Sequence, residues 1–110
     1  CVNWFRKGAD GAFAWPGFGE NMRVLVWMLG RVDGTAQGRP NAFGISPRYE
    51  DIDWKGMEFS RTQFDAVMTM DPTDWQEELK LHETLFAQLA HHLPREMTET
   101  KARIERQLAA

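Results

Sequence analysis

The chain has 110 residues with 13 basic and 16 acidic side chains, and its formal net charge of −3 excludes the strongly basic surface that nucleic-acid-binding domains use. Its 43% hydrophobic content suffices for one compact domain at most. The longest apolar run, Val24 to Leu29, is far shorter than the roughly 20 residues of a membrane span. Because the single cysteine, Cys1, excludes an internal disulfide, we expect a reducing, cytoplasmic setting without nucleic-acid or membrane partners.

The chain begins with "CVNWF" rather than with Met, and this run has the character of a β-strand. We therefore expect a segment of a longer protein, in which Cys1 is a buried strand residue. "RKGADG" then supplies turn residues, and "AFAW" alternates small and aromatic side chains until Pro16 and Gly17 break the run. The pattern predicts a short β-hairpin at the start of the chain.

A helix is predicted after Gly19. The Glu20-Asn21 step offers an N-cap or a first-turn acid, and "MRVLVWMLGRV" carries the helix to about residues 33–34. Apolar residues occupy every face of this helix, and a helix that is apolar all round is buried all round. Because the rest of the chain is too small to cover it, we expect exposed apolar surface from Val24 to Val32 unless other protein covers it.

Residues 33–60 are rich in Gly, Pro, Asp and Asn and predict a long surface connection. Ser60 then caps a helix, and Asp71-Pro72 is a cap followed by the helical position where proline is favoured. Pro94 ends this second helix and opens another. One apolar stripe on the helix before Pro94 contains Trp75, Leu79, His82, Phe86, Leu89 and Leu93.

The remaining histidines and the acidic run do not indicate a catalytic or metal-binding role. We interpret His82 as a boundary histidine of the apolar stripe, and the adjacent His91 and His92 point about 100° apart on a helix, too far to share a metal. The acidic run "YEDID", residues 49–53, lacks the glycine and the distal glutamate of a calcium loop. The sequence therefore predicts neither a metal site nor a catalytic residue.

Aromatic side chains gather before the first predicted helix, at Trp4, Phe5, Phe13, Trp15 and Phe18. They form either a small aromatic core under the hairpin or a stacking slot for a flat ring. In the second case Asn21 is the nearest group that selects a base, because its amide donates to O6 of guanine but meets another donor at N6 of adenine. Gly17 and Gly19 let backbone N–H groups approach a ligand at a helix start.

A family resemblance follows from these residues. The run "VNWFRKGADGAFAWPGFGENMRVLVWM" closely resembles the guanine-binding segment of GTP-dependent phosphoenolpyruvate carboxykinases. The resemblance continues more loosely through "AFGISPRYEDIDWKGM", "SRTQFDAV" and "DPTDWQEELKLHETLFAQLAHHLP", and so covers essentially the whole chain. It implies the C-terminal part of a bacterial member.

The resemblance also implies a fold and an activity. The parent is a monomeric, mixed α/β (α+β) enzyme of gluconeogenesis that converts oxaloacetate and GTP to phosphoenolpyruvate, GDP and CO2, with Mn²⁺ and Mg²⁺ held by ligands outside this chain. Within it, this chain is a short β-hairpin followed by mainly α-helices: residues 1–34 the guanine-binding hairpin and helix, 35–59 a connecting loop, and 60–110 the C-terminal helices. The implied guanine-site residues are Trp4, Phe5, Phe13, Phe18, Gly19, Glu20 and Asn21.

Some features of the family are missing or altered. Each lysine follows a residue other than glycine, so the Gly-Lys-Ser/Thr step of a phosphate loop is absent and we expect the chain alone to be inactive. Met22 stands where the family usually has serine, Val26 where a charged residue is common, and Ala14 where a larger apolar residue is usual. The alternative hypothesis is a non-enzymatic aromatic binding or helix-docking module.

Overall fold

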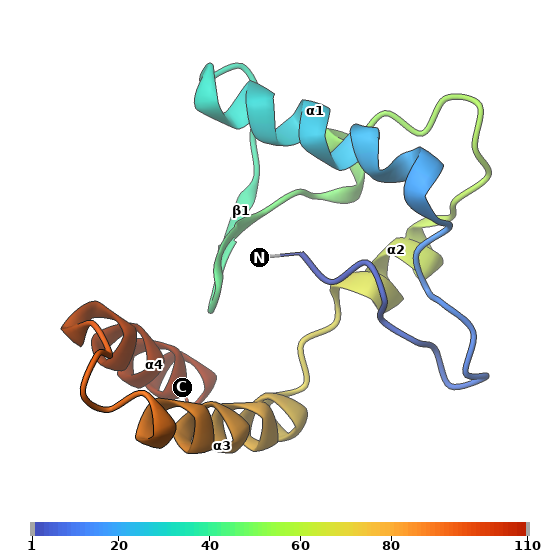
Figure 1. The fold of residues 1–110 in the computed structure, drawn as a ribbon. Coiled ribbons are helices and arrows are strands. Elements are labelled where there is room, and N and C mark those ends of the chain that lie inside the picture. Colours follow the sequence, from blue (N-terminus) through green and yellow to red (C-terminus); the bar gives the residue numbers. More distant parts are fainter. Residues whose placement is uncertain (1, 110) are drawn as a thin grey trace. The chain divides into compact units, whose positions relative to one another are not determined.

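The computed structural model describes residues 2–109, so the strand position expected for Cys1 lies outside the described residues. The chain divides into two compact units, Cys1–Thr69 and Met70–Ala110 (Figure 1). The first unit holds the 3-10 turns Phe18–Glu20 and Tyr49–Asp51, helices α1 (Asn21–Val32) and α2 (Arg61–Met68), and strands β1 (Arg39–Asn41) and β2 (Gly44–Ser46). The second unit holds α3 (Pro72–Gln88) and α4 (Arg95–Leu108). The predicted class, a short β-hairpin with mainly helices, is confirmed.

The first residues fold back on themselves as predicted, but through little regular pairing. Lys7 and Phe13 form an isolated antiparallel bridge, and the Ala14 N–H donates to the Arg6 carbonyl at 2.8 Å. The Arg6 guanidinium in turn donates to the carbonyl oxygen of Val67 at 2.9 Å. This arm is therefore attached to the end of α2.

The two-stranded sheet lies in the segment expected to be a connecting loop. β1 and β2 pair antiparallel with Arg39 opposite Ser46 and Asn41 opposite Gly44. Asn41 Oδ1 accepts a hydrogen bond from the Phe43 N–H at 2.8 Å, and Gly44 adopts a φ of 135°. An Asx turn and a glycine at positive φ close the hairpin, although no alternating apolar pattern marks its strands.

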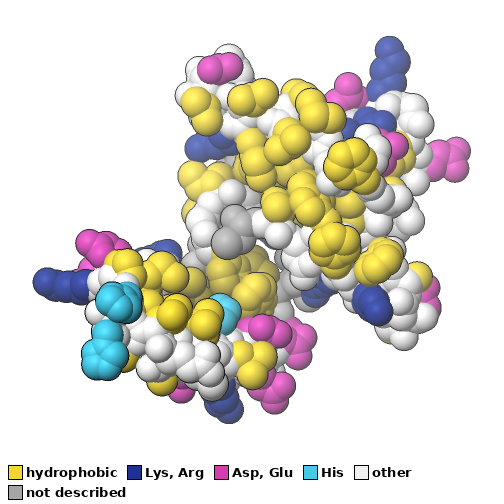
Figure 2. Space-filling model, in the orientation of Figure 1, with side chains coloured by type: hydrophobic (Ala, Val, Ile, Leu, Met, Phe, Trp, Pro, Cys, Tyr) yellow, Lys and Arg dark blue, Asp and Glu magenta, His cyan; other side chains and the backbone are white. Residues whose placement is uncertain are grey.

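Helix α1 starts and ends close to the predicted residues, but it is largely uncovered. Of its side chains only Trp27 is buried, at 8% exposure. Its remaining large apolar residues include five that are 41–84% exposed, namely Met22, Leu25, Val26, Leu29 and Val32. Figure 2 shows hydrophobic side chains gathered over this helix. The exposed apolar face predicted for residues 24–32 is thus present.

An aromatic core holds the first unit together. Its buried members are Trp15, Trp27, Ile52, Phe59 and Phe64. Partly buried rings, among them Trp4, Tyr49 and Trp54, pack against this cluster. Four of these eight residues, Tyr49, Ile52, Trp54 and Phe59, belong to the predicted loop at 35–59. That segment therefore contributes to the core as well as connecting two helices.

Local capping signals set the helix starts in the second half of the chain. The Ser60 side chain accepts from the Gln63 N–H, and Asp71 Oδ1 accepts from the Thr73 N–H at 2.8 Å, as the sequence predicts. Helix α3 ends at Gln88, whereas the expected end was Pro94. The backbone turns at residues 89–92 because the His92 N–H bonds to the Leu89 carbonyl at 2.8 Å.

In the second unit, α3 packs against α4. Leu79 of the predicted apolar stripe is buried at 4% exposure, and Lys101 of α4 donates to Glu83 of α3 at 2.9 Å. His82 and Leu89, both on the predicted stripe, are exposed. The stripe is therefore only partly covered by this pair of helices.

Candidate functional site

The five clustered aromatic residues divide between core and surface. Trp15 is buried at 6% exposure, and half-buried Trp4 packs on it with ring centroids 5.8 Å apart. Phe5 and Phe13 lie on opposite arms of the first turn, 73% and 61% exposed, and their ring centroids are 6.1 Å apart in an edge-to-face arrangement. The tryptophans of the cluster therefore belong to the core, and its phenylalanines lie at the surface.

Phe18 is the most exposed of these rings. It begins the 3-10 turn that leads into α1, and 91% of its surface is accessible. Gly17 before it has a φ of 130°, a backbone conformation that favours glycine. With that exposure the Phe18 ring packs against little else in the chain.

Asn21 is the polar residue that the fold connects to the aromatics. It is the first residue of α1, it is half-buried, and its Oδ1 accepts a hydrogen bond from Trp15 Nε1 at 2.8 Å. An indole N–H is only a donor, so the accepting atom must be the amide oxygen. The amide Nδ2 of Asn21 is left as a donor, and no acceptor contacts it within residues 2–109.

Glu20 and Gly19, the other residues of the turn before α1, have different surroundings. The Glu20 carboxylate pairs with Arg23, whose guanidinium also donates to the carbonyl oxygens of Asp53 and, at 3.0 Å, Lys55. The Glu20 N–H donates to the Gly17 carbonyl at 3.1 Å, so that N–H is already engaged. Gly19 is exposed and near the start of the turn, where backbone N–H groups lack helical partners.

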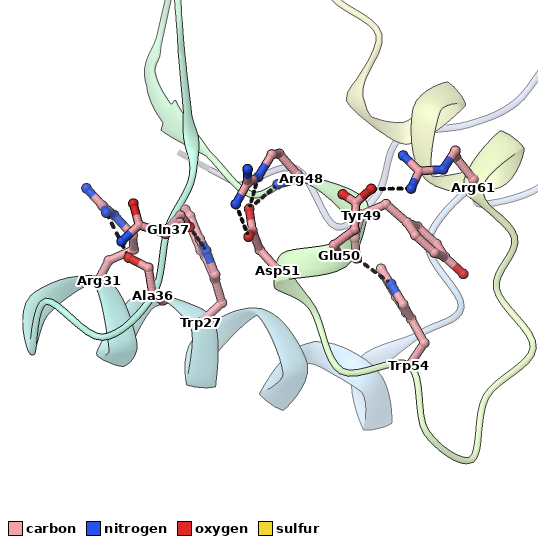
Figure 3. A network of polar contacts seen from close by, with 10 residues as sticks. All are labelled: Trp27, Arg31, Ala36, Gln37, Arg48, Tyr49, Glu50, Asp51, Trp54 and Arg61. Carbon is pink, nitrogen blue, oxygen red and sulfur yellow. Dashed lines mark hydrogen bonds and ion pairs between the residues drawn. The ribbon is translucent and has the colours of Figure 1, made fainter.

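Polar contacts join the second half of α1 to the segment that follows it (Figure 3). Trp27 Nε1 donates to the Gln37 carbonyl at 2.7 Å, and Arg31 donates to the Ala36 carbonyl at 2.8 Å. Trp54 Nε1 donates to the Tyr49 carbonyl at 2.8 Å. These bonds attach α1 and the turn at 49–51 to the loop segments that pack on the aromatic core.

Two carboxylates of the acidic run at 49–53 form ion pairs with arginines. Arg48 forms an ion pair with Asp51 at 2.8 Å, and this hydrogen-bonded guanidinium holds the pKa of Asp51 below its usual value. Arg61 pairs with Glu50, lowers the pKa of that carboxyl in the same way, and lies 5.0 Å from the centre of the Tyr49 ring. The sequence placed this run in a solvated loop, and its carboxylates serve local structure.

Neither a metal cluster nor a membrane helix occurs in the described part of the chain. No three His, Cys, Asp or Glu side chains among residues 2–109 are grouped so that they could hold a metal ion. None of the helices described combines the length and the hydrophobicity needed to cross a bilayer.

Sequence reasoning missed two supporting residues. Trp15 was grouped with the aromatics but not with the site, because a contact across six positions through a 3-10 turn has no periodic signal. Arg23 has no role in the sequence analysis, although its spacing of three from Glu20 is that of a helical ion pair.

Comparison with known proteins decides the family. Residues 1–107 match the family described as the phosphoenolpyruvate carboxykinase C-terminal P-loop domain. The chain belongs to the GTP-dependent phosphoenolpyruvate carboxykinase family. Among its relatives, the phosphoenolpyruvate carboxykinase [GTP] of Paenarthrobacter aurescens strain TC1 is 41% identical over 93 residues, which are 84% of this chain and 15% of that protein.

Two further phosphoenolpyruvate carboxykinases [GTP] are similar to the chain at about the same level of identity. The protein of Anaeromyxobacter dehalogenans strain 2CP-1 is 42% identical over 94 residues, covering 86% of this chain and 16% of the relative. The protein of Corynebacterium jeikeium strain K411 is 38% identical over 96 residues, which are 87% of this chain and 16% of that protein. The chain thus spans about a sixth of the length of these carboxykinases.

Proposed function

We propose that residues 4–21 form the guanine-binding site of a GTP-dependent phosphoenolpyruvate carboxykinase. The observation that carries this proposal is the Asn21 amide at the start of α1, whose Oδ1 accepts from Trp15 Nε1 and whose Nδ2 donor meets no acceptor among residues 2–109, three positions after the exposed ring of Phe18. Membership of the carboxykinase family, and the GTP in the names of the relatives, support guanine as the base.

The stability of the fold does not explain why three phenylalanine rings lie at the surface. Phe5, Phe13 and Phe18 leave 61–91% of their surfaces in water, so their burial adds little to stability. A stacked base covers such a ring and contributes about 1–3 kcal/mol per base, whichever base it is. The rings therefore supply affinity, and guanine must be selected by another group.

Asn21 supplies that selection. Its free amide donor matches the O6 acceptor of guanine, whereas the N6 amino group of adenine would face it with a second donor. A site that leaves buried polar groups unpaired with the wrong ligand rejects that ligand strongly. Backbone groups at Phe18 and Gly19, in an open turn at the start of α1, provide further contacts to the base edge.

The whole protein would convert oxaloacetate and GTP to phosphoenolpyruvate, GDP and CO2. In that reaction this chain contributes nucleotide choice and orientation, which lower the barrier by positioning. The Mn²⁺, the Mg²⁺ and the phosphate loop that the family resemblance implies would belong to other parts of the protein. Trp4 packs on Trp15, with ring centroids 5.8 Å apart.

The alternative is a helix-docking module without nucleotide preference, which the exposed apolar face of α1 favours. The test uses a chimera in which residues 1–107 replace the matching stretch of the Anaeromyxobacter dehalogenans relative. GDP and ADP are titrated while tryptophan fluorescence is followed. We expect the chimera to bind GDP more tightly than ADP. The Asn21→Ala variant of the chimera should bind the two nucleotides with equal affinity.

Asn41→Ala is the matched control, because Asn41 is also half-buried and hydrogen-bonded in the first unit but closes the β1–β2 turn. It should leave the ratio of GDP to ADP affinity unchanged. Equal affinity for both nucleotides in the unmutated chimera would refute the guanine site and support the docking module.

A further inference from the structure

The hydrogen bond from Trp15 Nε1 to Asn21 Oδ1, the indole–amide hydrogen bond, joins the aromatic core to the base-reading residue. We propose that Trp15 is a positioning residue that determines base specificity by fixing which way the Asn21 amide faces. This inference rests on the proposed guanine site and adds a specificity-determining residue to it.

Trp15 is rigidly placed. It is 6% exposed, and three rings surround it, with centroid distances of 5.8 Å to Trp4, 6.4 Å to Trp54 and 5.8 Å to Phe59. Close-packed interiors hold side chains in single rotamers. The indole N–H of Trp15 therefore has a fixed direction, and Asn21 must present its oxygen to that donor.

Two other indoles in the first unit, those of Trp27 and Trp54, have a different role. Trp27 Nε1 donates to the backbone carbonyl of Gln37, and Trp54 Nε1 donates to that of Tyr49. Both bonds fasten backbone to the core. Trp15 instead donates to a side chain, and it orients a group that has two chemically opposite ends.

The orientation decides which base is accepted. An asparagine amide that is free to turn can present either its NH2 donor or its oxygen acceptor, and thus suits guanine O6 or adenine N6 equally well. With Oδ1 engaged by the indole, the Nδ2 donor is the end of the amide that is left for a base. The indole–amide hydrogen bond therefore excludes the orientation that adenine needs.

The test removes the indole donor and preserves the ring. In the chimera described above, Trp15→benzothienylalanine replaces the N–H by sulfur in a side chain of nearly the same shape, and Trp15→Phe is the simpler variant. We expect the ratio of GDP to ADP affinity to fall about tenfold, the fold-change that corresponds to one net hydrogen bond. Weakened GDP binding and strengthened ADP binding both contribute.

Trp27→Phe is the matched control. It also removes a buried indole donor, at 8% exposure compared with 6% for Trp15, but its acceptor is a backbone carbonyl. It should lower stability by a similar amount and leave the GDP to ADP ratio unchanged. A fall in the ratio in both variants would mean that the effect is general loosening of the core, and would overturn the role of Trp15.

The outcomes separate this inference from the proposed function. If the unmutated chimera prefers GDP and benzothienylalanine at Trp15 leaves that preference intact, the positioning role is refuted and the guanine site stands. If the unmutated chimera has no preference, both fail. In the 110-residue chain, the indole proton of Trp15 should also exchange faster with solvent in Asn21→Ala than in Asn41→Ala, and equal exchange would contradict the hydrogen bond itself.

Discussion

Phe18→Ala should separate binding from stability, because the Phe18 ring is almost wholly in solvent. With 91% of its surface exposed, less than a tenth of a ring of roughly 200 Å² is covered in the folded chain. At about 25 cal/mol per Å², the covered part contributes only ~0.5 kcal/mol to the free energy of unfolding. The variant should therefore fold nearly as well as the parent chain.

The same change should be costly for guanine binding. Loss of one stacking ring removes about 1–3 kcal/mol of binding free energy, which lowers GDP affinity by roughly 5- to 150-fold. Because stacking is tolerant of the base, ADP affinity should fall in proportion. Phe18→Ala is thus expected to lower affinity without changing selectivity, in contrast to changes at Asn21.

Two assays measure these effects. Urea unfolding of the 110-residue chain, followed by tryptophan fluorescence, gives the free energy of unfolding, and nucleotide titration of the chimera gives the affinities. Phe64→Ala is the control for burial: Phe64 is 7% exposed, and its loss should cost about 3–5 kcal/mol. Val32→Ala, which removes an 84% exposed apolar side chain at the far end of α1, should change neither quantity.

The result that would refute this reasoning is specific. If Phe18→Ala lowers the free energy of unfolding by several kcal/mol, then the ring is packed and not available to a ligand. If instead both stability and GDP affinity are unchanged, Phe18 is not part of the guanine site.

Three further predictions follow from the contacts. Gly38→Ala should lower the free energy of unfolding by about 1–3 kcal/mol in urea, because the added Cβ would lie 2.7 Å from Ile45 Cγ2; an unchanged midpoint would contradict this packing. Arg48 lowers the pKa of Asp51 in the folded state, so the ion pair stabilises the fold above the unfolded pKa near 4, and this stabilisation is lost as the pH falls through the folded pKa. In Asp51→Asn the free energy of unfolding should therefore fall less steeply as the pH is lowered. An unaltered pH dependence would argue against the pair. Asn21→Asp keeps an oxygen that accepts from the indole but replaces the amide donor by an acceptor. The ratio of GDP to ADP affinity of the chimera should therefore fall about tenfold or more, and an unchanged ratio would contradict the donor role of Asn21.

The helix starts were predictable because the signals are local. Ser60 and Asp71 accept hydrogen bonds from N–H groups two or three residues ahead, and Pro72 occupies a first-turn position, so short sequence patterns determine these starts. The exposed apolar face of α1 followed from its composition in the same way. The end of α3 at Gln88 did not, since apolar spacing continues to Leu93 after the backbone has left the helix.

The rest depends on contacts that a sequence pattern does not encode. The β1–β2 pair arises from a turn at Asn41 and Gly44, within a segment that has no apolar alternation. Similarly, the sequence identified Asn21 and the aromatic cluster but not their connection through Trp15. That bond depends on how the 3-10 turn brings the start of α1 against the core.

The most direct test of the central claim is the ratio of the GDP and ADP dissociation constants of the chimera carrying residues 1–107. An oriented amide donor beside stacking rings predicts a clear preference for GDP that Asn21→Ala abolishes and Asn41→Ala retains. Equal dissociation constants for the two nucleotides would contradict the claim that this chain selects guanine.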